Sequence, residues 1–308
     1  PSRGLGDVYK RQLLKLMLDH FRLNRMDNLT GASPHSALIR QQLWSPVQNT
    51  SLWLAWWLHG IISTDDVITA FHSVQGRYHR LFQDATPLHE DFVHGGDEST
   101  GLSELLKKVR QATEDAPVGL EERPLVSLAL AGMGDAPPLP VGEAATAVGR
   151  AGAGMVFAGS DPDVHSVVVP ELVDGSVVYW HWYTAEGRIP QLPVYSPGDA
   201  DMGLRQAVDQ AEHVLNQNPG SRSVTRHHAP RLAVGELSDA FGLPGLPAGV
   251  PTRAEKLIAR ADVVSAIVEV ARSTPGGESL DPYLLPLGRA IRTARMVAVD
   301  YAQREILR

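Results

Sequence analysis

Alternating apolar and polar positions in the middle of the chain predict a small β-sheet. Short apolar runs at 125–131, 155–158, 164–169 and 177–183 are bounded by Gly, Pro or Asp, as strands usually are. Asp174-Gly175 lies between the last two runs and suits the positive φ angles of a type I′ turn. These two runs are therefore predicted to form an antiparallel hairpin in which Val173 pairs with Ser176 and Val169 lies opposite Trp180.

Helical periodicity dominates on both sides of this predicted sheet. Capping residues and apolar spacings of three and four indicate N-terminal helices, with Thr50 or Ser51 capping one and Ser63 with Asp66 forming a capping box on the next. The predicted helices cover 34–44, 52–59, 64–74, 104–114, 142–150, 201–217, 252–272 and a last segment from Asp281. Together these elements predict an α+β protein, with N-terminal helices, a central mainly antiparallel sheet of about four strands with helices on one face, and a C-terminal helical hairpin.

The C-terminal helices carry two further patterns. The 252–272 helix has apolar residues on two faces, so a second neighbour besides the last helix is required, and the sheet or the N-terminal helices are expected to supply it. In the last helix, Arg289, Arg292 and Arg295 lie roughly opposite an apolar stripe. They are therefore predicted to be a solvated face rather than a nucleic-acid contact.

The composition divides the chain into a helical region at 13–117, a sheet region at 118–220 and a C-terminal helical hairpin at 221–308. The hairpin could pack into one body with the rest. The middle region is acidic, with 4 basic and 13 acidic residues, a net charge of −9. Residues 1–12 are excluded from the fold prediction, because Gly6–Gln12 back-translates to the transposase end sequence of sequencing adapters. They are predicted to be translated adapter DNA at the edge of a metagenomic contig.

Charge and composition exclude several classes of function. The 308 residues include no cysteine, which excludes a disulfide scaffold, a Cys-ligated metal and a thiol nucleophile. The net charge of −7 argues against nonspecific nucleic-acid binding, which depends on phosphate neutralisation. No apolar stretch approaches the ~20 residues of a membrane helix, and no signal segment opens the chain. The sequence thus predicts a soluble, cytoplasmic bacterial protein that binds neither nucleic acid nor a membrane.

Two local motifs suggest chemistry without supporting it. His89 and His94 resemble a zincin pair, but a spacing of five residues places them on different faces of a helix, so a polar loop is the preferred interpretation. Gly149, Gly152 and Gly154 precede a strand instead of following one, which indicates a tight turn rather than a phosphate loop. No cofactor, metal site or catalytic residue is predicted.

The 177–183 strand offers a candidate interaction surface. Alternation places Val178, Trp180 and Trp182 on one face and Val177 on the other, together with Tyr179, His181 and Tyr183. The second face carries polar tips, so Tyr179, His181 and Tyr183 are the candidate partner surface. The alternative is that both faces of the strand are core.

A family resemblance rests on Leu125–Pro137 (LVSLALAGMGDAP), followed by Gly142-Glu143-Ala144. This strand, turn and helix start resemble a protein family of high-GC Gram-positive bacteria to which no activity is attached. The resemblance covers about residues 120–308, and Met133 stands where the family has proline. The sequence therefore favours a non-enzymatic interaction or regulatory protein that binds another protein through the aromatic face or the acidic middle region. The alternative is an enzyme or small-ligand-binding protein with a site built from residues distant in sequence.

Overall fold

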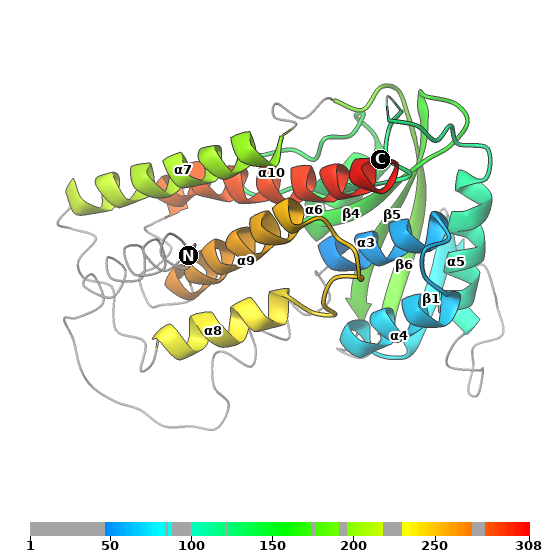
Figure 1. The fold of residues 1–308 in the computed structure, drawn as a ribbon, viewed down its shortest axis with the longest axis horizontal. Helices are drawn as coiled ribbons and strands as arrows, with labels where there is room; N and C mark the ends of the chain where they lie inside the picture. Colours follow the sequence, from blue (N-terminus) through cyan, green and yellow to red (C-terminus); the bar gives the residue numbers. More distant parts are fainter. Residues whose placement is uncertain are drawn as a thin grey trace.

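The structure, a computed structural model, describes residues 47–83, 86–87, 100–120, 122–173, 177–190, 196–217, 230–272 and 281–308. One six-stranded sheet lies at one end of the molecule, and four helices extend from it to the other (Figure 1). The strand order is β2-β1-β6-β5-β4-β3. The strands are β1 (Tyr78–Gln83), β2 (Thr86–Pro87), β3 (Val126–Leu130), β4 (Ala153–Ala158), β5 (Val164–Val173) and β6 (Val177–Glu186).

The α+β class and the mainly antiparallel sheet are confirmed. The four predicted strands are β3 to β6, and β1 and β2 are additional to the predicted four. All neighbouring pairs are antiparallel except β1 and β6, which run parallel. β1 carries His79 and Arg80 in a short run, so its alternating pattern is weak, although His79 and Leu81 are buried.

The predicted register of the β5–β6 hairpin is wrong by one residue. Val173 pairs with Val177 instead of Ser176, so three residues separate the paired ends. Pro170 therefore lies opposite Trp180, and Val169 lies opposite His181. Because side chains alternate along a strand, a slip of one residue changes every cross-strand neighbour. Val168, rather than Val169, shares a face with the two tryptophans.

The inner face of the sheet packs against helices from both ends of the chain. The helices are α3 (Val47–Leu58), α4 (Thr64–Gln75), α5 (Thr100–Thr113) and α10 (Asp281–Ile306). Trp180 and Phe157 are fully buried between these helices and the sheet, and the same apolar core includes Trp56 of α3, Leu105 of α5 and Leu287 of α10. One continuous core thus contains residues from each of the three compositional regions, whose boundaries stay a prediction.

Helix α3 begins earlier than expected, at Val47. Thr50 and Ser51, which were predicted as caps, lie inside it and donate hydroxyl hydrogen bonds to the carbonyls three residues earlier. The capping box of Ser63 and Asp66 at the start of α4 is confirmed. The indole N–H groups of Trp53 and Trp56 donate to the carbonyls of Gly245 and Ala248, so α3 also fixes the segment before α9.

Helix α6 (Glu143–Ala151) packs on the outer face of the sheet, so helices cover both faces rather than one. It ends at Gly152, which has a φ of +84° and accommodates the left-handed turn into β4. A Cβ at Gly154 would lie 2.7 Å from a methyl carbon of Val148, so glycine lets the helix approach the strand closely. The predicted tight turn into a strand is therefore confirmed.

The C-terminal helices form a layered bundle beside the sheet, made of α7 (Pro197–Gln217), α8 (Pro230–Phe241), α9 (Thr252–Arg272) and α10 (Figure 1). Both apolar faces of α9 are buried, as expected, but the second neighbour is α8. Ala266 and Val270 of α9 pack against Leu237 and Phe241 of this unpredicted helix. The prediction that the sheet or the N-terminal helices would cover this face is therefore wrong.

The arginines of α10 are not a solvated face. Arg295 is 15% exposed and pairs with buried Asp262 of α9 at 3.0 Å, and Arg292 is 16% exposed and pairs with Asp135 at 3.2 Å. Arg289 remains exposed and donates to the Gly134 carbonyl at 2.9 Å. The sequence prediction failed because α10 contacts other elements on most of its circumference, including α3, α7, α9 and β3.

Several expectations fall outside the described residues. They are the adapter-like residues 1–12, the helix at 34–44, the His89–His94 motif and the Asp174-Gly175 turn. Within the described helices, none is long and apolar enough to cross a membrane.

Candidate functional site

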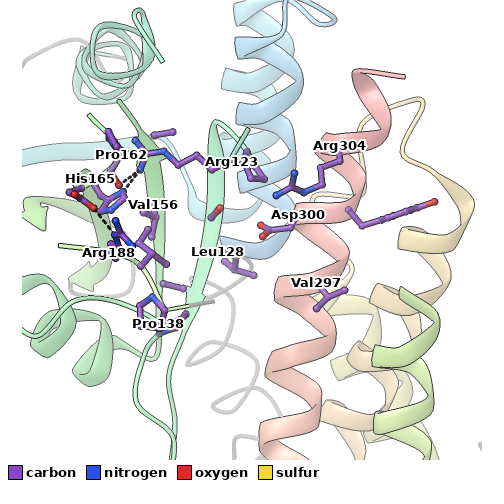
Figure 2. A pocket seen from close by; sticks show the side chains of 18 residues that line it. Arg123, Leu128, Pro138, Val156, Pro162, His165, Arg188, Val297, Asp300 and Arg304 are labelled. Atoms are coloured by element: carbon purple, nitrogen blue, oxygen red, sulfur yellow. Dashed lines mark hydrogen bonds and ion pairs between the residues drawn. The ribbon is translucent and has the colours of Figure 1, made fainter. Parts of the chain in front are cut away.

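A pocket of about 640 Å³ lies on the outer face of the sheet beside the edge strand β3 (Figure 2). Ser127, Ala129, Val156 and Ala158 of β3 and β4 point outward and form its floor. Its walls are the segment before β3, the β4–β5 turn, the segment after β6, and helix α10. Sites for small molecules usually have volumes of about 300–1,000 Å³, so this pocket is large enough for one.

Arg123, in the segment before β3, organises one end of the pocket. Its guanidinium donates hydrogen bonds to the carbonyls of Gly159 at 2.9 Å, Asp161 at 2.6 Å and Pro162 at 3.4 Å. It also contacts Nδ1 of His165 (Figure 2). Arg123 thereby fixes the β4–β5 turn and places a positive charge beside the floor of the pocket.

His165 of β5 is buried next to this arginine. Its Nε2 lies 3.0 Å from the Gly187 carbonyl, which can only accept, so Nε2 carries the proton and Nδ1 accepts from Arg123. Burial and the Arg123 charge both lower the His165 pKa. With both ring nitrogens engaged and a neutral ring, His165 positions the segment after β6 rather than serving as a free base.

Asp163 and Arg188 form the rim above His165. The two side chains lie 3.6 Å apart and are 54% and 91% exposed, so the ion pair is weak. Figure 2 shows Arg188 beside His165 on the side of the pocket opposite α10. An exposed guanidinium at the rim can turn toward a ligand at little cost, because few contacts hold it in place.

Asp300 of α10 lies at the other end of the pocket, where its carboxylate lies beside the Ser127 hydroxyl. Burial raises the Asp300 pKa to about 6, although the charge of Arg304 and the Ser127 hydrogen bond oppose this rise. In Figure 2, Asp300 and Arg304 project from neighbouring turns of α10 toward β3. A carboxyl group with a pKa near neutrality in a pocket is a frequent mark of a functional position.

Two neighbours on α10 hold Asp300 at this place. The side-chain amide of Gln303 accepts from the Val126 N–H at 3.1 Å and donates to the Val126 carbonyl, so it replaces a neighbouring strand along the open edge of β3. Arg304 donates to the carbonyls of Leu120 at 3.0 Å and Glu122 at 2.9 Å. These bonds fix the register between α10 and β3, and thus the position of Asp300 over Ser127.

The lining combines an apolar floor with a local excess of positive charge. Three arginines, Arg123, Arg188 and Arg304, face two aspartates, and His165 is neutral. The whole chain has a net charge of −7. The pocket is thus positive relative to the protein around it, which favours an anionic ligand.

The arrangement restricts the chemistry that the pocket can support. Among the described lining residues, the basic neighbour of Ser127 is a carboxylate, and the ring nitrogens of His165 are both engaged, so the Ser–His pair of a typical serine nucleophile is not formed. In the part of the chain that the structure describes, no three His, Asp or Glu side chains are placed to hold a metal ion. Arg304 is bonded to the carbonyls of Leu120 and Glu122, so the groups that remain for a ligand are the Arg188 guanidinium and the Asp300 carboxyl.

The predicted partner surface lies elsewhere on the outer face, along β6. Tyr179, His181 and Tyr183 share that face and are each partly exposed, as the alternation predicts. The Phe82 ring of β1 packs between the first two, with centroids 4.7 Å from Tyr179 and 5.4 Å from His181. His181 Nε2 also lies 2.7 Å from the Glu171 carboxylate. We call Phe82, Tyr179 and His181 the aromatic surface.

Tyr183 is separated from this surface in its contacts. It packs against the apolar layer beneath α6 and lines a shallow depression with Glu143, Thr146 and Arg150 of that helix. Burial raises the Tyr183 pKa. The structure therefore brings Tyr179 and His181 together with Phe82, which sequence reasoning missed, and leaves Tyr183 with α6.

The sequence did not single out the pocket residues, because they come from separate segments. Arg123 and His165 are 42 residues apart, and Val126 and Gln303 are 177 residues apart. The one local signal was the polar group within the last helix, where Asp300, Gln303 and Arg304 interrupt an otherwise apolar face toward β3. The alternation of β3, with Ser127 between buried neighbours, marked its outward face.

The fold and the site define an α+β protein with a positively charged pocket on the outer face of a mixed sheet. The family model for the N-terminal domain of Rv1486c-like proteins matches residues 48–195, and the model for their C-terminal domain matches residues 198–296. The chain therefore belongs to the Rv1486c-like family, which confirms the resemblance to a high-GC bacterial family. No curated protein and no solved structure matches the chain, so the comparisons assign no ligand or reaction.

Proposed function

We propose that this protein binds a small anionic molecule with an apolar body in the pocket beside β3. The observation that carries the proposal is the lining itself, in which three arginines surround a floor of Ala129, Val156 and Ala158. The side chains of Ala129 and Ala158 are small, so the pocket above them has room for a flat apolar ligand. Arginine supplies planar pairs of donors that match carboxylate, sulfonate and phosphate groups.

Binding is favoured over catalysis by the state of the polar groups. His165 and Arg123 are occupied by each other and by backbone carbonyls, so they build the site instead of reacting in it. The proposed function is therefore the ligand-binding alternative rather than the interaction protein that the sequence favoured. A cytoplasmic location stays a prediction, which cell fractionation would test.

A simple aromatic anion tests the proposal. We expect naphthalene-2-sulfonate to bind the full chain with one-to-one stoichiometry in isothermal titration calorimetry. The variant Arg188→Gln removes a rim charge that contributes little to the fold. We expect its affinity to fall about three- to tenfold, because an exposed charge is screened by solvent and contributes about as much as an ordinary hydrogen bond. Arg253→Gln makes the same change on the exposed start of α9 and serves as the matched control.

The proposal fails if the wild-type protein does not bind the sulfonate, or if Arg188→Gln and Arg253→Gln bind it equally well. A charge reversal, Arg188→Glu, should weaken binding further than the neutral variant. Thermal unfolding of each variant, measured in parallel, separates lost binding from lost structure.

Protein binding through the aromatic surface is a second candidate function. Three ring side chains in mutual contact and partly exposed, with an ion pair beside them, resemble the residue types that dominate interfaces. A partner that copurifies with the wild-type chain should be lost with the double variant Tyr179→Ser and His181→Ser and kept with Arg253→Gln. Retention of the same partner by the double variant would exclude this surface.

A further inference from the structure

The two ends of the pocket differ in chemistry, and a ligand that spans them must match both. Ser127 lies on β3 and His165 on β5, with β4 between them. Two strand spacings of about 4.8 Å separate these ends by roughly 10 Å across the sheet. The His165 end is bordered by Arg123 and Arg188, whereas the Ser127 end is bordered by Asp300 and by Arg304, whose guanidinium is bonded to the carbonyls of Leu120 and Glu122.

Asp300 is the only carboxylate at the α10 end among the lining residues that the structure describes. The Ser127 hydroxyl lies beside this carboxylate. On the same helix, Gln303 is bonded to the backbone of Val126, and Arg304 is bonded to the carbonyls of Leu120 and Glu122. A carboxylate has about four lone-pair sites on two oxygens, so acceptor capacity remains for a ligand. A negatively charged ligand group would be repelled here, whereas a hydroxyl or amino hydrogen would be accepted.

We propose that Asp300, supported by Ser127, forms a hydrogen-bond-accepting subsite, so that the ligand is an elongated anion that carries a hydroxyl or amino donor at the end opposite its negative charge. The anionic end then lies toward Arg123 and Arg188, and the apolar body lies over Ala129, Val156 and Ala158. This inference rests on the proposed ligand-binding function and adds the polarity and orientation of the ligand to it.

A pair of probes separates the inference from the function on which it rests. Naphthalene-2-sulfonate and 6-hydroxynaphthalene-2-sulfonate differ only by a hydroxyl at the end opposite the sulfonate. At pH 7.5, where the Asp300 carboxyl is mainly ionised, we expect the hydroxylated probe to bind about tenfold more tightly, as for a hydrogen bond to a charged acceptor. The quantity of interest is the ratio of the two dissociation constants, measured by calorimetry.

Two substitutions should change this ratio in different ways. Asp300→Ala removes the acceptor, so the ratio should fall to about one while the affinity for the unsubstituted probe is kept. Arg188→Gln acts at the other end, so it should weaken both probes equally and leave the ratio unchanged. Asp300→Asn retains one neutral acceptor and the side-chain shape, so an intermediate ratio is expected even if Asp300→Ala folds poorly.

The outcomes are distinguishable. If neither probe binds the wild-type protein, the proposed function fails and the subsite with it. If both probes bind with equal affinity, or if the preference for the hydroxylated probe survives in Asp300→Ala and Asp300→Asn, the pocket binds anions and the Asp300 subsite is overturned. A preference that is lost in the Asp300 variants and kept in Arg188→Gln and Arg253→Gln supports the subsite and its orientation.

Discussion

The indole Nε1 of Trp180 donates a 3.1 Å hydrogen bond to Nδ1 of His79, and the two rings lie nearly parallel with their centroids 6.1 Å apart. His79 in turn donates from Nε2 to the Gly76 carbonyl at 2.9 Å, and the His72 ring stacks on its other side. Both ring nitrogens of His79 therefore form hydrogen bonds, and the ring is neutral. This pair joins β1 to β6 in the part of the sheet where the strands run parallel.

The state of His79 predicts a loss of stability in acid. Burial lowers its pKa from 6.5 to about 4, so the unfolded chain takes up the proton first. The stability that neutral His79 contributes is complete above about pH 6.5 and is lost as the pH falls to 4, by about 2–3 kcal/mol. Urea unfolding at several pH values should show this loss in the wild type and a smaller one in His79→Gln.

The comparison with His79→Gln is needed because other groups act in the opposite direction. Burial raises the pKa values of Asp262 and Asp300 to about 6, so their protonation between pH 6 and 4 favours the folded state. These carboxyl groups are present in both proteins, so the difference between the two curves isolates His79. Parallel curves would mean that His79 does not titrate in this range.

Truncation of Trp180 should destabilise the protein far more than truncation of Tyr179. Trp180 is fully buried, and loss of such a side chain costs about 3–5 kcal/mol. Tyr179 neighbours it on the strand but points to the other face and is partly exposed, so Tyr179→Ala should cost about 1 kcal/mol. Chemical unfolding of both variants, and of Tyr183→Ala, measures this difference. Equal costs would show that the outer face is core.

Replacement of Gln303 by an apolar residue of similar size should destabilise the folded protein. In Gln303→Leu, the N–H and the carbonyl of Val126 lose their partner while they remain buried, at about 1–3 kcal/mol for each unsatisfied group. We therefore expect a loss of about 2–4 kcal/mol in urea unfolding. Gln210→Leu on the exposed side of α7 is the matched control and should change stability by less than about 0.5 kcal/mol. Equal effects in the two variants would contradict a role for Gln303 at the edge of β3.

Asp300→Asn should stabilise the folded protein at pH 8. The Asp300 pKa is raised to about 6 from 3.8, so the ionised carboxylate destabilises the folded state above pH 6, and protonation relieves this between pH 6 and 4. A neutral amide of the same shape removes the penalty, and we expect a gain of about 1–2 kcal/mol at pH 8 that disappears near pH 4. Thermal unfolding measures it, with the exposed Asp115→Asn as control. A loss of stability at pH 8 would show that Arg304 and Ser127 outweigh burial.

A gain of stability in Asp300→Asn would also indicate function. Residues selected for binding or catalysis are often retained at a cost to stability. A buried carboxylate that only weakens the fold has no structural reason to be present, so a reduced preference for the hydroxylated probe in the same variant would indicate a role in binding.

The local patterns of the sequence predicted those parts of the fold that depend on neighbouring residues. The alternation of 177–183 identified the buried tryptophans and the outward Tyr179 and His181, because side-chain direction in a strand has a period of two. The capping box at Ser63 and the glycine turn into β4 were equally local. The α+β class follows from these elements.

Relationships between distant segments could not be predicted in the same way. The turn dipeptide at 174–175 suggested a two-residue loop, but three residues separate the paired valines, and the register shifted with them. The parallel partner of β1 is a strand about 100 residues later. Arg123, His165 and Asp300 line one pocket because the sheet and α10 bring their separate segments together. The spacing of these residues along the chain does not predict that proximity.

The long separation of these contacts has a consequence for biosynthesis. Trp53 and Trp56 of α3 donate to carbonyls 192 residues further along the chain, and β1 has no parallel partner until β6 is made. At translation rates of about 5–20 residues per second, the acceptor carbonyls of Gly245 and Ala248 are synthesised roughly 10–40 s after α3. During that interval its indole-rich surface is exposed on the nascent chain. We therefore expect α3 to be recognised by the chaperones that bind apolar segments during synthesis.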